Sequence, residues 1–216
     1  MTDREDEWSD IDLAFGVIDA DEVPNILSDW TAHLYEQYRA LHHVDVRFRT
    51  WIYRVFLLPD TMQVDLAFTP ATEFRALSPA FRLVFGKAND TRPAAPQPVA
   101  DVIGMGWLYT LHARSCIARG KAWQAEYMIS GIRDSALAVA CIHHGIPAVY
   151  GRGFDRLPRA VTAPLEGSLV RGLDAAELAR AFRVAVDGLL GVIGRIDEEL
   201  AGRLRAPLTS LTETTC

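Results

Sequence analysis

Acidic residues recur within two short apolar runs of the sequence. The run "SDIDLAFG" occupies residues 9–16, and the run "QVDLAFTP" occupies residues 63–70. On a strand, successive side chains point to opposite faces, so Asp10 and Asp12 share one face, and Asp65 lies on the polar face of the second run. Two carboxylates separated by one residue lie about 7 Å apart along a strand and repel each other unless a cation lies between them. The sequence therefore predicts a divalent cation, such as magnesium, bound by these three aspartates.

The apolar residues of the two runs are expected to form the buried face of a sheet, because they alternate with the acids. In the first run they are Ile11, Leu13 and Phe15, and in the second they are Val64, Leu66 and Phe68.

The composition limits the class of protein. The chain has 216 residues, 50% of them apolar and 23% charged, as in ordinary globular proteins. Its net charge of −6 argues against a general nucleic-acid binder. It has three cysteines, too few and too irregularly spaced for a disulfide framework. No apolar run approaches the roughly 20 residues of a membrane span, and the opening "MTDREDEW" is acidic, unlike a secretory signal. We expect a cytoplasmic protein without a membrane partner.

The residue composition and the hydrophobic pattern change once along the chain. Residues 87–100, "KANDTRPAAPQPVA", contain three prolines and no apolar period, which predicts a linker. Residues 1–86 mix strand and helix patterns, whereas residues 101–216 are helical almost throughout. The expected fold class is α+β, with a small mixed sheet domain followed by an all-helical bundle domain.

The expected elements follow from periodicity and capping residues. In the first domain, Asp21 is expected to cap a helix with Pro24 in its first turn, and "WIYRVFLLP" and "MQVDLAF" read as a hairpin. In the second domain, helices are expected over about 101–119 and 123–143. A long third helix is expected to start at the capping pair of Asp174 and Glu177 and to continue to Leu204.

These motifs resemble a known family. "WSDIDLAFG", followed after one helix by a hairpin ending in "QVDLAF", is similar to the catalytic core of the nucleotidyltransferases related to DNA polymerase beta, particularly the bacterial aminoglycoside and lincosamide nucleotidyltransferases. The segment "KAWQAEYMISGIRDSALAVACIHHG" is similar to the helical half of such proteins. The resemblance covers most of the chain. It implies magnesium-dependent transfer of a nucleoside monophosphate from ATP, or another nucleoside triphosphate, to a hydroxyl of a small molecule such as an aminoglycoside-like antibiotic.

The resemblance also implies roles for individual residues. Asp10, Asp12 and Asp65 would hold magnesium, with two ions expected, and Ser9 would lie with Asp10 and Asp12 at the nucleotide. Asp65 would also help to deprotonate the acceptor. Glu126, on the second expected helix of the bundle, would be a base for the acceptor hydroxyl, although a solvated surface position explains this residue equally simply. A homodimer is compatible with the pattern.

One part of the family's pattern is not found in the sequence. The family places a Gly-Ser turn about ten residues before the acidic pair, where helix N-terminal amides bind the triphosphate. Here only eight residues precede Ser9, and none of them is glycine. Either the sequence starts inside a longer product, or the protein is a shortened relative, catalytically weak or silent, that acts as a binding or interaction module. "GSLVRG" at residues 167–172 matches the missing turn, but its context favours a small-residue helical turn.

Other candidate residues are weaker. Asp45 in "HHVDVRF" is a rival to Asp65 for the third acid, but its neighbours lack a paired-strand context. Cys141, His143 and His144 resemble a fragment of a zinc site without a second pair of ligands. A glycosyltransferase that binds metal through Asp-x-Asp would need several βα units before the acids, so this alternative is the weakest. The sequence does not identify the acceptor or the base of the nucleotide.

Overall fold

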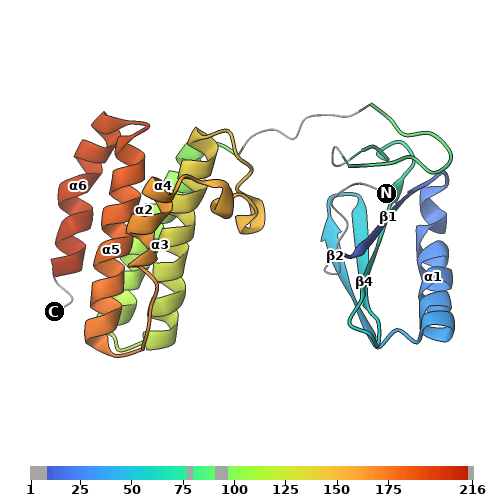
Figure 1. Ribbon diagram of the computed structural model, residues 1–216, viewed down its shortest axis with the longest axis horizontal. Coiled ribbons are helices and arrows are strands. Elements are labelled where there is room, and N and C mark those ends of the chain that lie inside the picture. Colours follow the sequence, from blue (N-terminus) through green and yellow to red (C-terminus); the bar gives the residue numbers. More distant parts are fainter. Residues whose placement is uncertain (1–8, 77–79, 91–96, 214–216) are drawn as a thin grey trace. The chain divides into compact units, whose positions relative to one another are not determined.

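The chain forms two compact units. The computed structural model describes residues 9–76, 80–90 and 97–213. The units are Met1–Ala94, which holds a mixed sheet, and Ala95–Cys216, which is helical (Figure 1). This confirms the expected α+β fold class. The expected linker, 87–100, includes residues outside the described part, so its bounds stay a prediction.

The first unit is built on a four-stranded mixed sheet. Its strands are β1 (Ile11–Val17), β2 (His42–Phe48), β3 (Trp51–Leu57) and β4 (Gln63–Pro70), in the spatial order β1-β4-β3-β2. β1 pairs with β4 in parallel, and the other two pairings are antiparallel. Because β1 and β4 are parallel, the residues that begin these two strands lie at the same end of the sheet.

Helix α1 (Val23–Tyr38) covers one face of the sheet (Figure 1). Its buried residues Val23, Leu27 and Leu34 pack with the apolar side chains of the strands, which include Phe56, Val64, Leu66 and Phe68. Val64, Leu66 and Phe68 are buried on this face, as the alternation predicts. We call the opposite face, which carries Asp12 and Asp65, the open face.

The start of α1 differs from the sequence expectation. Pro24 lies in the first turn, as predicted, but Asp21 is not the cap. Asp21 lies in a 3-10 turn, Ala20–Glu22, where its backbone N–H donates to the Asp19 side chain at 3.0 Å. The capping interaction therefore belongs to this short turn before the helix.

β1 is buried over only part of its length. Ile11 and Leu13 were expected in the core, but they are 46% and 39% exposed. Phe15 is half-buried and stacks on Phe68 with ring centroids 5.1 Å apart, and Val17 is buried. β1 is an edge strand among the described strands, and its residues in the core shared with α1 are Phe15 and Val17, in its C-terminal half.

The strand β2 was not predicted from the sequence. Residues 42–48 pair with β3 along their whole length, with Val44 opposite Val55 and Asp45 opposite Arg54. Polar and apolar residues alternate in this run, but its apolar residues Val44 and Val46 are exposed on the open face rather than buried in a core. The pairing with β3, and not burial, makes this segment a strand, which is why its hydrophobic pattern alone was ambiguous.

A segment after β4 covers the far end of the open face. Phe74, Phe81 and Ala88 pack there with Trp51 and Ala67. The Asn89 side-chain amide donates to the carbonyls of Ala71 and Phe74, both at 2.8 Å. These hydrogen bonds connect the end of the segment to its start. The acidic end of the open face lies outside this contact, since Asp10 and Asp12 are exposed.

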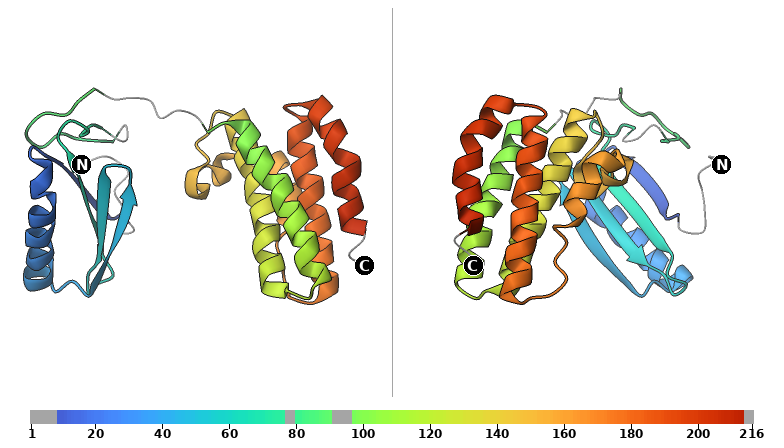
Figure 2. Two further views of the ribbon diagram at one scale, coloured as in Figure 1. Left: turned by 180° about the vertical axis from the view of Figure 1, so that it is seen from behind. Right: turned by 60° about the vertical axis from the view of Figure 1, so that its left-hand side comes forward.

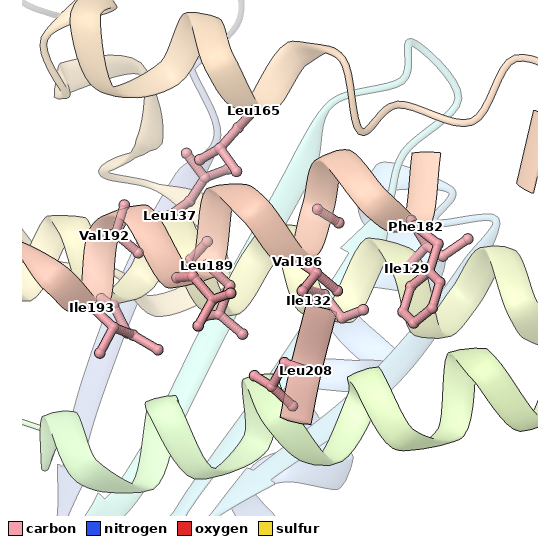
Figure 3. Close-up of a cluster of buried hydrophobic side chains, with 14 of the residues drawn as sticks. Ile129, Ile132, Leu137, Leu165, Phe182, Val186, Leu189, Val192, Ile193 and Leu208 are labelled. Carbon is pink, nitrogen blue, oxygen red and sulfur yellow. The ribbon is translucent and has the colours of Figure 1, made fainter. Parts of the chain in front are cut away.

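The second unit contains four long helices that run side by side (Figures 1 and 2). They are α2 (Val99–Ala118), α3 (Ala122–His143), α5 (Ala175–Gly194) and α6 (Glu198–Glu213). The shorter α4 (Arg159–Glu166) packs on α5. Figure 3 shows the buried side chains between them, with Phe182, Val186 and Leu189 from α5 close to Ile129 and Ile132 from α3. Within the described helices, none is long and apolar enough to cross a membrane.

The expected third helix of the bundle is two helices. Its start is as predicted, because the Asp174 side chain accepts from the Glu177 backbone N–H at 2.9 Å. The helix ends at Gly194, and α6 begins after Asp197, whose side chain accepts from the Leu200 N–H at 2.8 Å. The apolar stripe continues through both helices, so periodicity alone did not reveal the break. Residues 167–172 form a turn and an irregular segment between α4 and α5.

We expect Gly16→Ala to destabilise the protein by about 1–3 kcal/mol, because overpacking forces neighbours to move. A Cβ atom at Gly16 would lie 2.7 Å from the Cβ of Phe74 and 2.8 Å from its Cγ, so the covering segment would have to shift. Thermal denaturation measures the change. Gly202→Ala in α6 is the matched control, since nothing lies within 4 Å of its added Cβ. An unchanged melting temperature for Gly16→Ala would contradict the close approach.

Candidate metal centre

The structure brings Asp10, Asp12 and Asp65 together at one end of the sheet. Asp12 and Asp65 are register partners in the parallel pair of β1 and β4, and Asp10 immediately precedes β1. Oxygen atoms of the three side chains all lie within 4.8 Å of one another. We call these residues the acid triad. In the described residues, no other group of three or more His, Cys, Asp or Glu side chains has this proximity.

The carboxylates of the acid triad repel one another. Burial raises the pKa of Asp65, and the negative charges of Asp12 and Asp10 raise it as well. Asp65 is half-buried, whereas Asp10 and Asp12 are exposed. A site with this charge favours a bound cation, because a positive charge would offset both the repulsion and the partial desolvation of Asp65.

The donor set fits a hard divalent cation. Carboxylate oxygens are preferred ligands of Mg²⁺, and two oxygens bound to one Mg²⁺ at about 2.1 Å lie about 3 to 4.2 Å apart. One oxygen from each residue lies within 4.8 Å of the others, so small side-chain rotations would bring the three oxygens to one ion. Water or phosphate oxygens would complete an octahedral shell, as is usual for Mg²⁺.

Gln63 joins the site, which the sequence analysis did not foresee. Its side-chain amide nitrogen donates to Oδ1 of Asp65 at 3.0 Å and to Oδ2 of Asp10 at 3.3 Å. We call this pair of hydrogen bonds the Gln63 bridge. The available signal was its position two residues before Asp65, which puts both side chains on one face of β4. The bridge lowers the pKa of Asp65, opposing the effect of burial and of the other two acids.

Asp45, the rival for the third acid, lies on the other face of the sheet. Its two carboxylate oxygens accept from Nε and Nη2 of Arg54 at 2.7 and 2.8 Å. Arg54 also donates to the hydroxyl of Thr31 on α1 at 2.6 Å. These hydrogen bonds hold the pKa of Asp45 below its ordinary value. Asp45 therefore stabilises the contact between the sheet and α1 and is not part of the acid triad.

Two other predicted site residues are placed as follows. Ser9 lies immediately before Asp10 in the chain. Glu126 lies in α3 of the helical unit, where its carboxylate accepts from the Ser130 hydroxyl at 2.7 Å. The acid triad and Glu126 thus belong to different units, and the role of Glu126 stays a prediction.

An apolar area adjoins the acid triad on the open face. Val55 is the register partner of Asp65, and Val44 is the register partner of Val55. Val44, Val46 and Leu57 are all exposed. The open face therefore offers charge on β1 and β4 and exposed apolar surface on β2 and β3. This surface was not predicted from the sequence, because β2 was not predicted.

Comparisons with known proteins match the chain to solved structures alone. No protein-family model matches the chain, and no curated protein matches it significantly. The chain is similar to a crystal structure of an aminoglycoside 6-adenyltransferase from Bacillus subtilis, with 13% sequence identity and a TM-score of 0.43. The match covers 94% of this chain and 88% of that chain. The observed order, a small mixed sheet followed by helices, is the order expected from the sequence.

We expect Asp45→Asn to destabilise the protein by about 1–3 kcal/mol, because Arg54 loses its charged partner while remaining largely buried. The folded-state pKa of Asp45 is lowered, so its contribution is complete above the ordinary pKa of about 3.9 and is lost as the pH falls through the lowered value. Denaturant unfolding from pH 7 to pH 3 should show the difference from wild type narrowing below about pH 4.

The control for this variant is Asp29→Asn, at an exposed position on α1. It should leave stability nearly unchanged at every pH. Divalent-cation binding by Asp45→Asn should equal that of wild type, and a loss of binding would return Asp45 to the candidate ligands.

Proposed function

We propose that this protein is a nucleotidyltransferase that uses magnesium to move a nucleoside monophosphate from ATP, or another nucleoside triphosphate, to a hydroxyl of a small molecule. The observation that carries this proposal is the acid triad. Two separate acidic runs, which the sequence resemblance to nucleotidyltransferases singled out, supply carboxylates to one end of two parallel strands.

The proposed roles of the residues rest on the sequence resemblance, and the surroundings of the acid triad support them. Asp10 and Asp12, which are exposed, would hold the cation at the edge of the sheet, where a triphosphate can reach it. Bound magnesium would neutralise charge on the triphosphate and on the leaving pyrophosphate. Asp65 would be the third ligand and would also help to deprotonate the acceptor hydroxyl. Glu126 is proposed as a second base from the helical unit.

The open face supports a substrate that is both polar and apolar. The acid triad would take the metal-bound phosphates, and the exposed surface of Val44, Val46 and Leu57 would contact an apolar face of the nucleoside or the acceptor. Hydroxylated antibiotics of the aminoglycoside type are the proposed acceptor class, on the strength of the sequence resemblance. The chain's acidic net charge of −6 favours such cationic molecules.

The metal site is tested by titrating the full chain with Mn²⁺ in a calorimeter. Wild type should bind, and Asp12→Asn should weaken the binding at least about tenfold, because a ligand charge is lost from the first coordination shell. Asp29→Asn removes the same charge from an exposed position on α1 and should bind like wild type. Equal losses in the two variants would contradict the site.

The activity is tested with labelled nucleoside triphosphates and a panel of hydroxylated small molecules that includes aminoglycosides. We expect transfer of label to at least one acceptor, and a loss of about 10² to 10³ in rate in Asp12→Asn. Binding of Mn²⁺ without transfer to any acceptor would favour a catalytically silent binding module instead.

A further inference from the structure

The Gln63 bridge connects the two strands that supply the acid triad. One amide nitrogen donates both to Asp65, on the same strand, and to Asp10, beside the neighbouring strand. A side-chain amide nitrogen has two N–H groups, so it can serve both carboxylates at once. Gln63 is thus a neutral donor between two acids whose charges otherwise repel.

A cation in this site would bind the same carboxylates. The oxygen atoms of the acid triad are within 4.8 Å of one another, and Oδ1 of Asp65 and Oδ2 of Asp10 already accept from Gln63. The Gln63 nitrogen lies 3.0 Å from an oxygen of Asp65 and 3.3 Å from an oxygen of Asp10, so it bridges these two carboxylates. A divalent ion shared by the triad would also bridge them, so the amide and the ion would compete for the same carboxylates.

We propose that Gln63 is a positioning residue that takes the place of the cation in the metal-free protein and is displaced when the cation binds. This inference rests on the proposed function, because it concerns the same acid triad. The bridge holds Asp10 and Asp65 close together against their repulsion, and Gln63 is exposed, so its side chain is free to rotate away.

The sign of the effect follows from linkage. An interaction that exists only in the metal-free state stabilises that state and therefore opposes metal binding. Removing the bridge should make the metal-free protein less stable and make the affinity for the cation higher. The bridge would thus set the cation concentration at which the site becomes loaded.

The test compares Gln63→Met with wild type, because methionine keeps the length of the side chain and removes its donors. Calorimetric titration of the full chain with Mn²⁺ should show binding about three- to tenfold tighter in Gln63→Met, the range that corresponds to the net contribution of a hydrogen bond. Gln37→Met, at an exposed position on α1 of the same unit, is the matched control and should bind like wild type.

Thermal unfolding gives a second measurement. In the presence of a chelator, Gln63→Met should melt at a lower temperature than wild type. With saturating Mn²⁺ the two proteins should melt together, because neither then contains the bridge. A residue with only a structural role would lower the melting temperature equally in both conditions.

The outcomes separate this inference from the proposed function. Wild-type binding of Mn²⁺ with equal or weaker binding by Gln63→Met would overturn the inference and leave the metal site in place. A melting difference that persists at saturating Mn²⁺ would overturn it as well. Failure of the wild-type protein to bind Mn²⁺ would overturn the proposed metal site and, with it, the competition between Gln63 and the ion.

Discussion

The parallel pairing of β1 with β4 is the constraint on which the candidate site depends. These strands are far apart in the sequence, yet their register sets Asp12 opposite Asp65. A shift of one residue would turn one of these carboxylates to the α1 side of the sheet. The register is secured beyond the acids, where Phe15 stacks on Phe68 and the segment containing Phe74 packs on Gly16. Apolar packing at one end of the strands thus maintains an electrostatically unfavourable cluster at the other.

The carboxylates on the two faces of the sheet have different hydrogen-bond partners. On the α1 face, Asp45 is paired with Arg54 in two hydrogen bonds, so its charge is already compensated. On the open face, the acid triad has the Gln63 amide between Asp10 and Asp65, which is a neutral donor. A neutral donor only partly offsets carboxylate repulsion. This difference explains why an aspartate stabilises the fold on one face of the sheet, whereas aspartates on the other face are candidate metal ligands.

The acid triad and the general architecture could be predicted from the sequence because they depend on local patterns. The alternation of acidic and apolar residues indicates which side chains share one face of a strand. Apolar residues three or four positions apart indicate the helices of the bundle. The N-cap Asp174 could also be predicted, since a cap involves residues three positions apart. The break between α5 and α6 could not be predicted, because the apolar stripe continues through it. The exposed β2 was missed because its partner β3, and not a buried face, determines its structure.

The sequence by itself determined which residues could carry the chemistry, two acids on one strand and a third on another, together with the order of sheet and helices. Only the tertiary structure decided the register that sets Asp65 opposite Asp12, and the pairing that gives Asp45 the partner Arg54, since strand order and register are set by contacts between distant segments. It also decided that Gln63 reaches both strands and that Ile11 and Leu13 are exposed. Local spacing fixes the face of a strand on which a side chain lies, whereas its neighbour across the sheet depends on how the whole chain folds.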